Sequence, residues 1–519
     1  MLAHHYLAAL DLVRSSRDDV AASRLADSAR RYLRLAADRA LGLDATQAEA
    51  RLSTALELTP VDHPERTDLV VRWADAAFQA GRYREAAAAM DEAMVDLRRL
   101  GDPNRTADAL IRRSEIARMI GVGSPLDLAA EAVGLIEDRP DELLVEACTE
   151  LARAQWLVGS SAEASGTAER ALELAKSLGL AEPARALGYR GLARAELGDR
   201  DGIEEADRAL ELLVSRGSGR DAAYMMSNLA LIRWLIDGPG VTLVALEEAA
   251  TFSRRRNIAS AGHVIEGNLV DMLADSGRMN DALAMALRHV AEADESGDRF
   301  DASDAAAWVA YLLGERGDLV GASEHGEKAV EFGLTAESID LIVGLARVAH
   351  AWLACGEMER ARELIQAIEA RPGVRDGLFH NVWVPVMVRV AIGVGDRDLA
   401  GQIIDGLEPT YPLHVAGIVA ARAEIAAADA DLEGAIDLYA SAVARLRGLG
   451  NVRELAYALM GEGRCLRRLG RPGGGEASLT EARELFASFG FSGRAVEVEA
   501  LLAEGPAERE RSTGAARPA

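Results

Sequence analysis

The chain has 519 residues and a formal net charge of −25, with 49% hydrophobic but only 4% aromatic residues. This acidity argues against binding to DNA or RNA, because affinity for a polyanion depends on clustered Lys and Arg that neutralise phosphates. No apolar stretch approaches about twenty residues free of charge, so we expect neither a membrane span nor a membrane partner.

Residues 1–30 are expected to form a helical linker or cap. His4, His5 and Asp11 interrupt the first apolar segment, and no basic leader precedes it, so the sequence predicts no signal peptide. An odd number of widely spaced cysteines favours a reducing, cytoplasmic compartment. These cysteines are Cys148, Cys355 and Cys465.

Residues 31–503 repeat one pattern with a period of about 39 residues: an apolar helical run, a turn residue, then a small residue five positions later. Gly suits such turns because a left-handed residue at a helix end is least strained without a Cβ. The turn residues are Leu43, Gly81, Gly121, Gly159, Gly198, Gly238, Gly277, Gly317, Gly356, Gly395, Ala430 and Gly470.

Alanine at the fifth position after the turn would let the two helices of a pair approach closely. It recurs as Ala86, Ala164, Ala282, Ala322, Ala361, Ala400 and Ala435, whereas Ile203 breaks the rule. A repeat of this size cannot bury its apolar face alone and must stack on its neighbours. We therefore predict an all-α fold, an α-α superhelix of about twelve helical hairpins.

The order of turn residue, small residue, bulky or apolar residue and Ala resembles the tetratricopeptide repeat. Three stretches carry it best: Gly81/Ala86/Met90/Ala93, Gly159/Ala164/Ala168/Ala171 and Ala430/Ala435/Tyr439/Ala442. The period is longer than the usual 34 residues of that repeat. In this respect the chain is similar to the repeat region of MalT-like bacterial regulators, among them large signal-transducing (STAND-type) ATPases, cyclase-linked proteins and LuxR-type regulators.

The first ten residues, Met1–Leu10, also resemble the segment that joins the ATPase module to the repeats in such proteins. The resemblance implies a protein-binding scaffold whose partner is a protein or peptide, with an ATPase or cyclase regulator as one possibility and a small inducer as another. We expect no helix-turn-helix in residues 504–519, which are too poor in apolar groups to order and are expected to form a disordered tail.

No catalytic motif is recognisable. A phosphate-binding loop needs Gly before its Lys, yet Ala175 precedes Lys176 and Glu327 precedes Lys328, the only lysines. The histidines have no metal-binding spacing along a helix. We therefore expect no enzyme, and no catalytic, cofactor or metal residue.

In such a superhelix the first helix of each pair lines the concave side, and positions six and nine before each turn should face the groove. Aromatic and Arg side chains, the usual anchors of recognition surfaces, gather there in one stretch. The predicted groove site consists of Asn268, Asp271, Trp308, Tyr311, Arg347, His350 and Arg389. The alternative is that Trp308 and Tyr311 pack between helices while the charged groups are ordinary solvated side chains.

Three functions remain open. The favoured one is a non-enzymatic scaffold or sensor of bacterial signalling that binds a peptide, protein or inducer in its concave groove. The second is a truncated repeat fragment of a cyclase or ATPase regulator with no independent partner. The third is a small-molecule enzyme with an unrecognised site.

Overall fold

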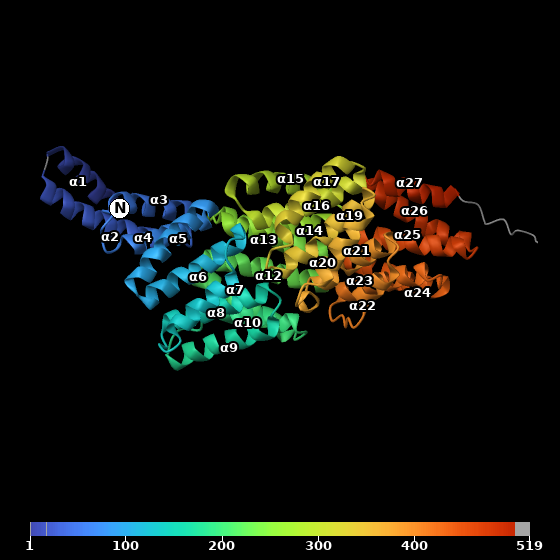
Figure 1. The fold of residues 1–519 in the computed structure, drawn as a ribbon, viewed down its shortest axis with the longest axis horizontal. Helices are drawn as coiled ribbons and strands as arrows, with labels where there is room; N and C mark the ends of the chain where they lie inside the picture. The colour runs from blue at the N-terminus through green and yellow to red at the C-terminus, as the bar shows by residue number, and fades with distance from the viewer. Residues whose placement is uncertain (1, 17, 504–519) are drawn as a thin grey trace, which may run out of the picture.

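The computed structural model describes residues 2–16 and 18–503, and the expected tail at 504–519 lies outside the described residues. Apart from one 3-10 turn, every regular element in the described part is an α-helix (Figure 1). The N-terminal half contains α1 (Leu2–Ser16), α2 (Asp19–Ala40), α3 (Ala45–Glu57), α4 (Arg66–Gln79), α5 (Tyr83–Leu100), α6 (Pro103–Ile120), α7 (Pro125–Ile136), α8 (Glu142–Leu157), α9 (Ser161–Ser177), α10 (Ala184–Glu196), α11 (Asp201–Ser215), α12 (Gly219–Asp237) and α13 (Pro239–Arg254).

The C-terminal half continues the same pattern. Its elements are α14 (Ala259–Asp275), α15 (Met279–Ser296), α16 (Arg299–Arg316), α17 (Leu319–Gly333), α18 (Ile339–Gly344), α19 (Ala346–Ala354), α20 (Met358–Glu369), η1 (Val374–Asp376), α21 (His380–Gly393), α22 (Arg397–Ile404), α23 (Pro412–Ala428), α24 (Leu432–Leu449), α25 (Val452–Arg468), α26 (Pro472–Phe489) and α27 (Ser492–Ala503).

Each turn residue named above falls between the two helices of one antiparallel pair, beginning with α2 and α3 and ending with α25 and α26. The predicted all-α superhelix of about twelve hairpins is thus confirmed. All turn residues except Leu43 have a positive φ, including Ala430 at 65°, where a Cβ makes this conformation costly. Helix α2 crosses the expected boundary at residue 30, so the division of the chain there stays a prediction.

The small residues five positions after the turns, from Ala86 to Ala435, are all fully buried between paired helices. The exception at Ile203 has a structural explanation in the same hairpin. There the close approach of α10 and α11 is made by two glycines, and a Cβ on Gly191 would lie 2.5 Å from the carbonyl oxygen of Gly202. In this hairpin the close contact falls on Gly202, one residue before the usual fifth position after the turn, and the two helices still pair.

Successive turns of the superhelix touch each other. α4 packs on α14, α6 on α16, α12 on α23, α14 on α25 and α16 on α27. Helices about ten places apart in the helix order are therefore in contact, and in Figure 1 they follow one another along the long axis of the molecule. At one crossing, Gly238 lies so close to Leu449 that a Cβ would overlap the Leu449 carbonyl oxygen.

Polar side chains also join the turns. Arg453 on α25 donates from Nε to Oδ1 of Asp275 at the end of α14, over 2.9 Å, and both residues are only 1% exposed. Asn451 donates to the other oxygen of Asp275 over 2.8 Å. These contacts join the C-terminal end of α14 to the N-terminal start of α25 in the next superhelical turn.

None of the helices in the described ranges is long and apolar enough to cross a membrane.

Candidate functional site

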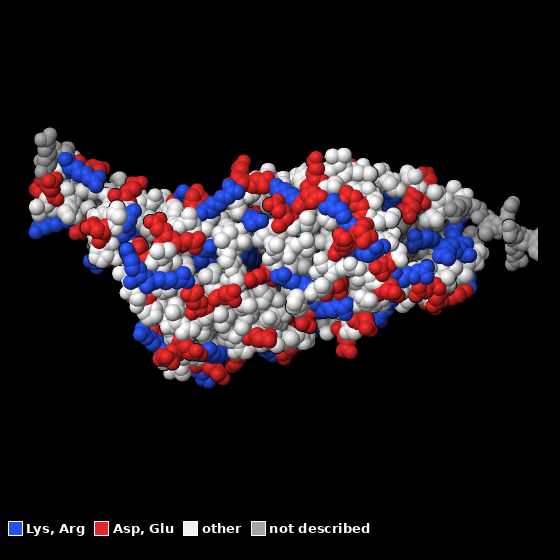
Figure 2. Space-filling view, in the orientation of Figure 1, with Lys and Arg blue, Asp and Glu red and all other residues white. Residues whose placement is uncertain are grey.

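A cavity of about 90 Å³ lies where α6, α8, α12, α14, α16, α18, α19 and α21 meet, and we call it the central cavity. Its apolar walls are largely aromatic: Trp156, Trp234, Phe300, Phe379 and Trp383. Its charged lining consists of Arg118, Asp271, Asp301, Asp304, Asp340 and Arg347. Figure 2 shows that one face of the molecule is hollowed in this middle region.

Three of the seven predicted groove residues line the central cavity: Asn268, Asp271 and Arg347. Trp308 lies behind them, 1% exposed, and its indole nitrogen donates to Asp271 over 2.9 Å. The Arg347 guanidinium stacks 4.8 Å from the Trp308 ring, donates to the Gly344 carbonyl over 2.8 Å and pairs with Asp304. These contacts fix the wall of the cavity.

The other three predicted residues, Tyr311, His350 and Arg389, lie in a second group nearer the C-terminus. The Tyr311 hydroxyl is 3.3 Å from that of Tyr457, and His350 pairs with the buried carboxylate of Glu315. Of these three, Arg389 lines a cavity of its own, distinct from the central cavity. The structure therefore divides the predicted site into two groups, one with Trp308 at the central cavity and one around Tyr311.

Two charged groups of the central cavity stand out because no ion pair within the described residues engages them. Arg118 on α6 stacks on Phe300 at 4.3 Å, and its one hydrogen bond is to the sulfur of Met119. Asp340 on α18 has no hydrogen-bond partner among the described side chains and backbone groups. Burial raises the pKa of Asp340 to about 7, and the nearby positive charge of Arg118 partly opposes this shift.

Burial likewise raises the pKa of Asp271 to about 7, although Arg347 opposes it. Burial lowers the pKa of Arg118. This buried cavity is thus a costly environment for the charges of Arg118, Asp271 and Asp340, and a polar ligand that pairs with them would relieve that cost.

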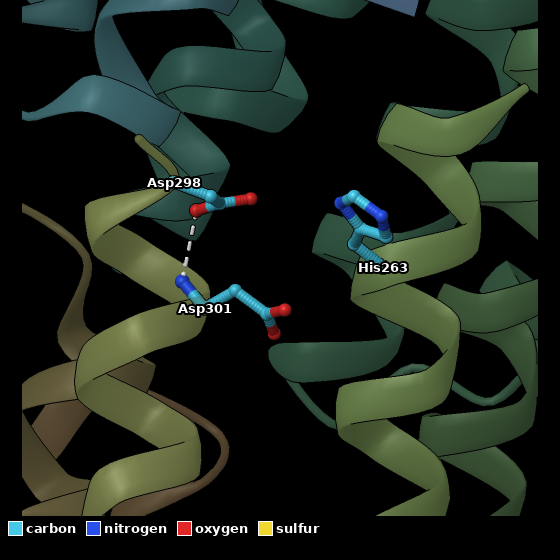
Figure 3. Close-up of side chains that lie close together, drawn as sticks. All are labelled: His263, Asp298 and Asp301. Carbon is cyan, nitrogen blue, oxygen red and sulfur yellow. Dashed lines mark hydrogen bonds between the residues drawn. The ribbon is translucent and has the colours of Figure 1, made fainter. Parts of the chain in front are cut away.

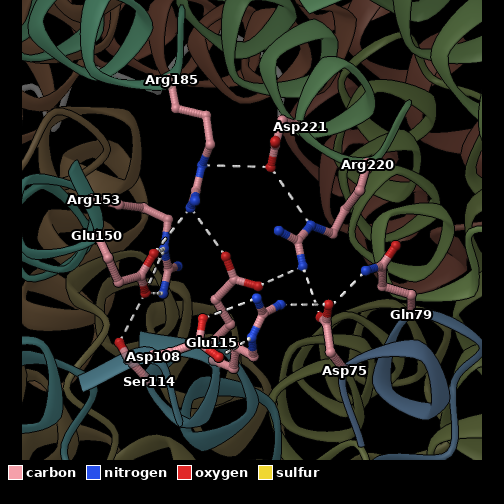
Figure 4. A network of polar contacts seen from close by, with 11 residues as sticks. Asp75, Gln79, Asp108, Ser114, Glu115, Glu150, Arg153, Arg185, Arg220 and Asp221 are labelled. Carbon is pink, nitrogen blue, oxygen red and sulfur yellow. Dashed lines mark hydrogen bonds and ion pairs between the residues drawn. The ribbon is translucent and has the colours of Figure 1, made fainter. Parts of the chain in front are cut away.

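The neighbouring charges on the axis behave differently, because each has a partner (Figure 4). Arg220 bridges Asp75 at 3.2 Å and Glu115 at 2.8 Å, and Arg185 joins Glu115 to Glu150 at 3.0 and 2.9 Å. Burial opposes ionisation of Glu115, but Arg220 and Arg185 outweigh it and lower its pKa to about 2. This network is satisfied internally and holds the N-terminal hairpins together. Arg118 lies at the border of this network but, unlike these arginines, has no ion-pair partner among the described residues.

A group that could hold a metal ion lies beside the central cavity (Figure 3). His263, Asp298 and Asp301 each offer a ligand atom, and these atoms lie within 4.8 Å of one another. Burial and then Asp301 raise the pKa of Asp298 to about 8, so this carboxyl keeps its proton at neutral pH. His289 lies 3.3 Å from Asp301 and 3.1 Å from Glu266, and these two carboxylates outweigh burial and raise the pKa of His289 to about 10.

The predicted positions six and nine before the turns missed Arg118 and Trp156, which lie three before Gly121 and Gly159. Leu353 and Ile392 hold the same position in later hairpins and also line a cavity. The position three before the turn was therefore the missing signal. No repeat position marks Asp340, because it lies on the short helix α18, which is an extra helix before the pair α19 and α20.

No individual curated protein matches the chain in sequence. Solved structures resemble it in fold. A Rap protein complexed with competence and sporulation factor has a TM-score of 0.48 at 13% identity, covering 66% of this chain and 97% of that one.

Two further structures show the same kind of likeness. The APC/C hetero-tetramer Cut9–Hcn1 has a TM-score of 0.42 at 15% identity, with 91% of this chain and 95% of that chain covered. The human IFIT1 dimer with m7Gppp-AAAA has a TM-score of 0.40 at 15% identity, with 86% and 96% covered. At these identities the likeness concerns the fold alone. The family described as the MalT-like TPR region matches residues 184–497, more than half of the 519, and the chain therefore belongs to that family.

Proposed function

We propose that the chain is a non-enzymatic binding scaffold of bacterial signalling that senses a small ligand or a short peptide through the central cavity. The observation that carries this proposal is the presence of two opposite charges, Arg118 and Asp340, without ion-pair partners among the described residues, on an aromatic-walled cavity of the superhelix. Ligand sites are commonly apolar pockets with a few convergent polar groups.

The ligand expected from this arrangement is compact and carries both a cationic and an anionic group. A carboxylate of the ligand would pair with the guanidinium of Arg118, and an ammonium would pair with Asp340 and stack on the surrounding rings. Free amino acids and dipeptides have this chemistry, and they are the natural first probes.

Occupancy would be transmitted because the cavity is built from several hairpins. Arg118 belongs to the third hairpin and Asp340 to the ninth, so a ligand between them ties neighbouring turns of the superhelix together. A protein partner, including an ATPase or cyclase regulator, could then distinguish the filled from the empty form by differential affinity. A cytoplasmic setting is supported by the three unpaired cysteines.

The test is a thermal-shift screen of the full chain with each proteinogenic amino acid and with dipeptides, followed by calorimetry. A ligand present at 100 times its Kd should stabilise the fold by about 2.7 kcal/mol. N-acetylation should abolish binding because it removes the ammonium that faces Asp340, and amidation should abolish it because it removes the carboxylate that faces Arg118.

Arg118→Gln and Asp340→Asn should each weaken binding at least tenfold. Arg98→Gln is the matched control, since Arg98 is exposed and pairs with Glu131 away from the cavity. Trp308 is unsuited to this purpose, because its replacement would open a void in the core. Binding that survives both cavity substitutions, or a screen in which none of these probes binds, would refute the central cavity as the sensor.

A further inference from the structure

A second cavity lies apart from the central cavity, and we call it the C-terminal cavity. It has a volume of about 380 Å³ and lies among α19, α21, α23, α24, α25 and α27. That volume is within the usual range of small-molecule sites. No residue of the central cavity lines it.

The charge of its lining is opposite to that of the whole chain. The charged residues on its walls are Arg389, Glu424, Arg464, Arg468, Arg494 and Glu497. Four guanidinium groups thus face two carboxylates, in a chain whose net charge is −25. Figure 2 shows the corresponding basic area around the end of α25.

Several hydrogen-bond donors on these walls have no partner. Arg464 and Arg468, one helical turn apart on α25, make no ion pair with any described residue, although other arginines of the axis do. The Nη1 atom of Arg389 and the hydroxyl of Tyr439 are buried at the wall and also lack hydrogen-bond partners in the described part of the chain. Leaving buried donors unsatisfied costs free energy that an acceptor would recover.

The remaining wall groups are held in place by the fold. Arg389 donates to Glu454 over 2.7 Å and stacks 3.8 Å from the Tyr457 ring, and Arg494 pairs with Glu315 at 3.1 Å. Burial raises the pKa of the Tyr439 hydroxyl, which therefore remains a donor at neutral pH. These arginine side chains need little ordering when a ligand arrives.

We propose that the C-terminal cavity is a binding site for a small polyanion, held by Arg464 and Arg468 at the mouth and by Arg389 and Tyr439 at the wall. Guanidinium groups pair bidentately with both carboxylates and phosphates, so the shared chemistry is two or more negative charges on a compact body. The site does not depend on the ligand of the central cavity.

Calorimetry at low ionic strength tests the proposal on the full chain, with citrate as the polycarboxylate probe, pyrophosphate as the phosphate probe and glucose as a neutral probe. We expect one equivalent of citrate or pyrophosphate to bind, and glucose not to bind. Which anion binds more tightly distinguishes a carboxylate ligand from a phosphorylated one.

Arg464→Gln and Arg468→Gln should each lower the affinity at least tenfold. The control Arg445→Gln removes an exposed arginine of the neighbouring α24 that contacts only Ser441, and it should leave the affinity unchanged. Arg118→Gln should also leave it unchanged, which separates this site from the proposed sensor. The proposal is overturned if neither anion binds, or if the Arg464 and Arg445 variants lose affinity equally.

Discussion

The contact between superhelical turns makes a quantitative prediction at Arg453. This residue and Asp275 are each 1% exposed and are joined over 2.9 Å. Removing one partner of a buried ion pair costs about 3 to 5 kcal/mol, because the remaining charge is left without compensation. Asp275 keeps one hydrogen bond from Asn451, so we expect Arg453→Met to cost about 3 kcal/mol, the lower end of that range.

The double variant Arg453→Met/Asp275→Asn should recover about 1 to 2 kcal/mol, since the uncompensated charge of Asp275 is then removed, and Glu454, the other partner of Arg453, keeps its ion pair with Arg389. Urea unfolding followed by circular dichroism measures each variant. The matched control is Arg447→Met on the exposed pair of Arg447 with Glu481, also close at 2.6 Å, which joins neighbouring hairpins and should cost less than about 1 kcal/mol. If Arg453→Met is no more destabilising than Arg447→Met, the buried pair of Arg453 and Asp275 does not hold the superhelical turns together.

Three further outcomes follow from the backbone and from the buried carboxyl groups. Ala430→Gly should raise stability by about 1 kcal/mol in thermal unfolding, because Ala430 holds a φ of 65° that only Gly adopts without strain. Gly238→Ala should lower the melting temperature, and more than Gly240→Ala does, since a Cβ at Gly238 meets the Leu449 backbone whereas one at Gly240 meets nothing within 4 Å. Raising the pH from 6.5 to 8 should also lower the melting temperature. Burial raises the pKa of Glu196 to about 8, so the folded state binds a proton that the unfolded chain has already lost. This stabilisation disappears as the pH passes 8. Glu196→Gln should flatten that dependence, and an unchanged slope would contradict the assignment.

The turn residues were predictable because each reflects one local requirement, a helix end that reverses the chain. Even Ala430, the only turn among them with a positive φ that lacks Gly, could be placed by the period alone. The hairpin register was equally local, since Ala86 and its equivalents report the distance between two adjacent helices.

The site was harder to predict because it depends on contacts across superhelical turns. Trp308 is flanked by Trp383, and Tyr311 by Tyr457, a residue 146 positions away along the chain. No repeat period contains that information. Whether the seven predicted residues bind a partner stays a prediction. The structure adds Arg118 and Asp340, which lie outside the positions six and nine before a turn, and Arg464, which lies six before Gly470 but was not among the predicted residues.

The packing of α4 on α14 and of α14 on α25 also limits how this protein can change over evolutionary time. An open solenoid tolerates the duplication or loss of a repeat, because each unit touches only its neighbours. Here the deletion of a single hairpin would bring different residues opposite each other at every later crossing and would separate Asp275 from Arg453. Recombination between repeats is therefore expected to be disfavoured in this chain, and length variants should differ at the two ends rather than in the middle.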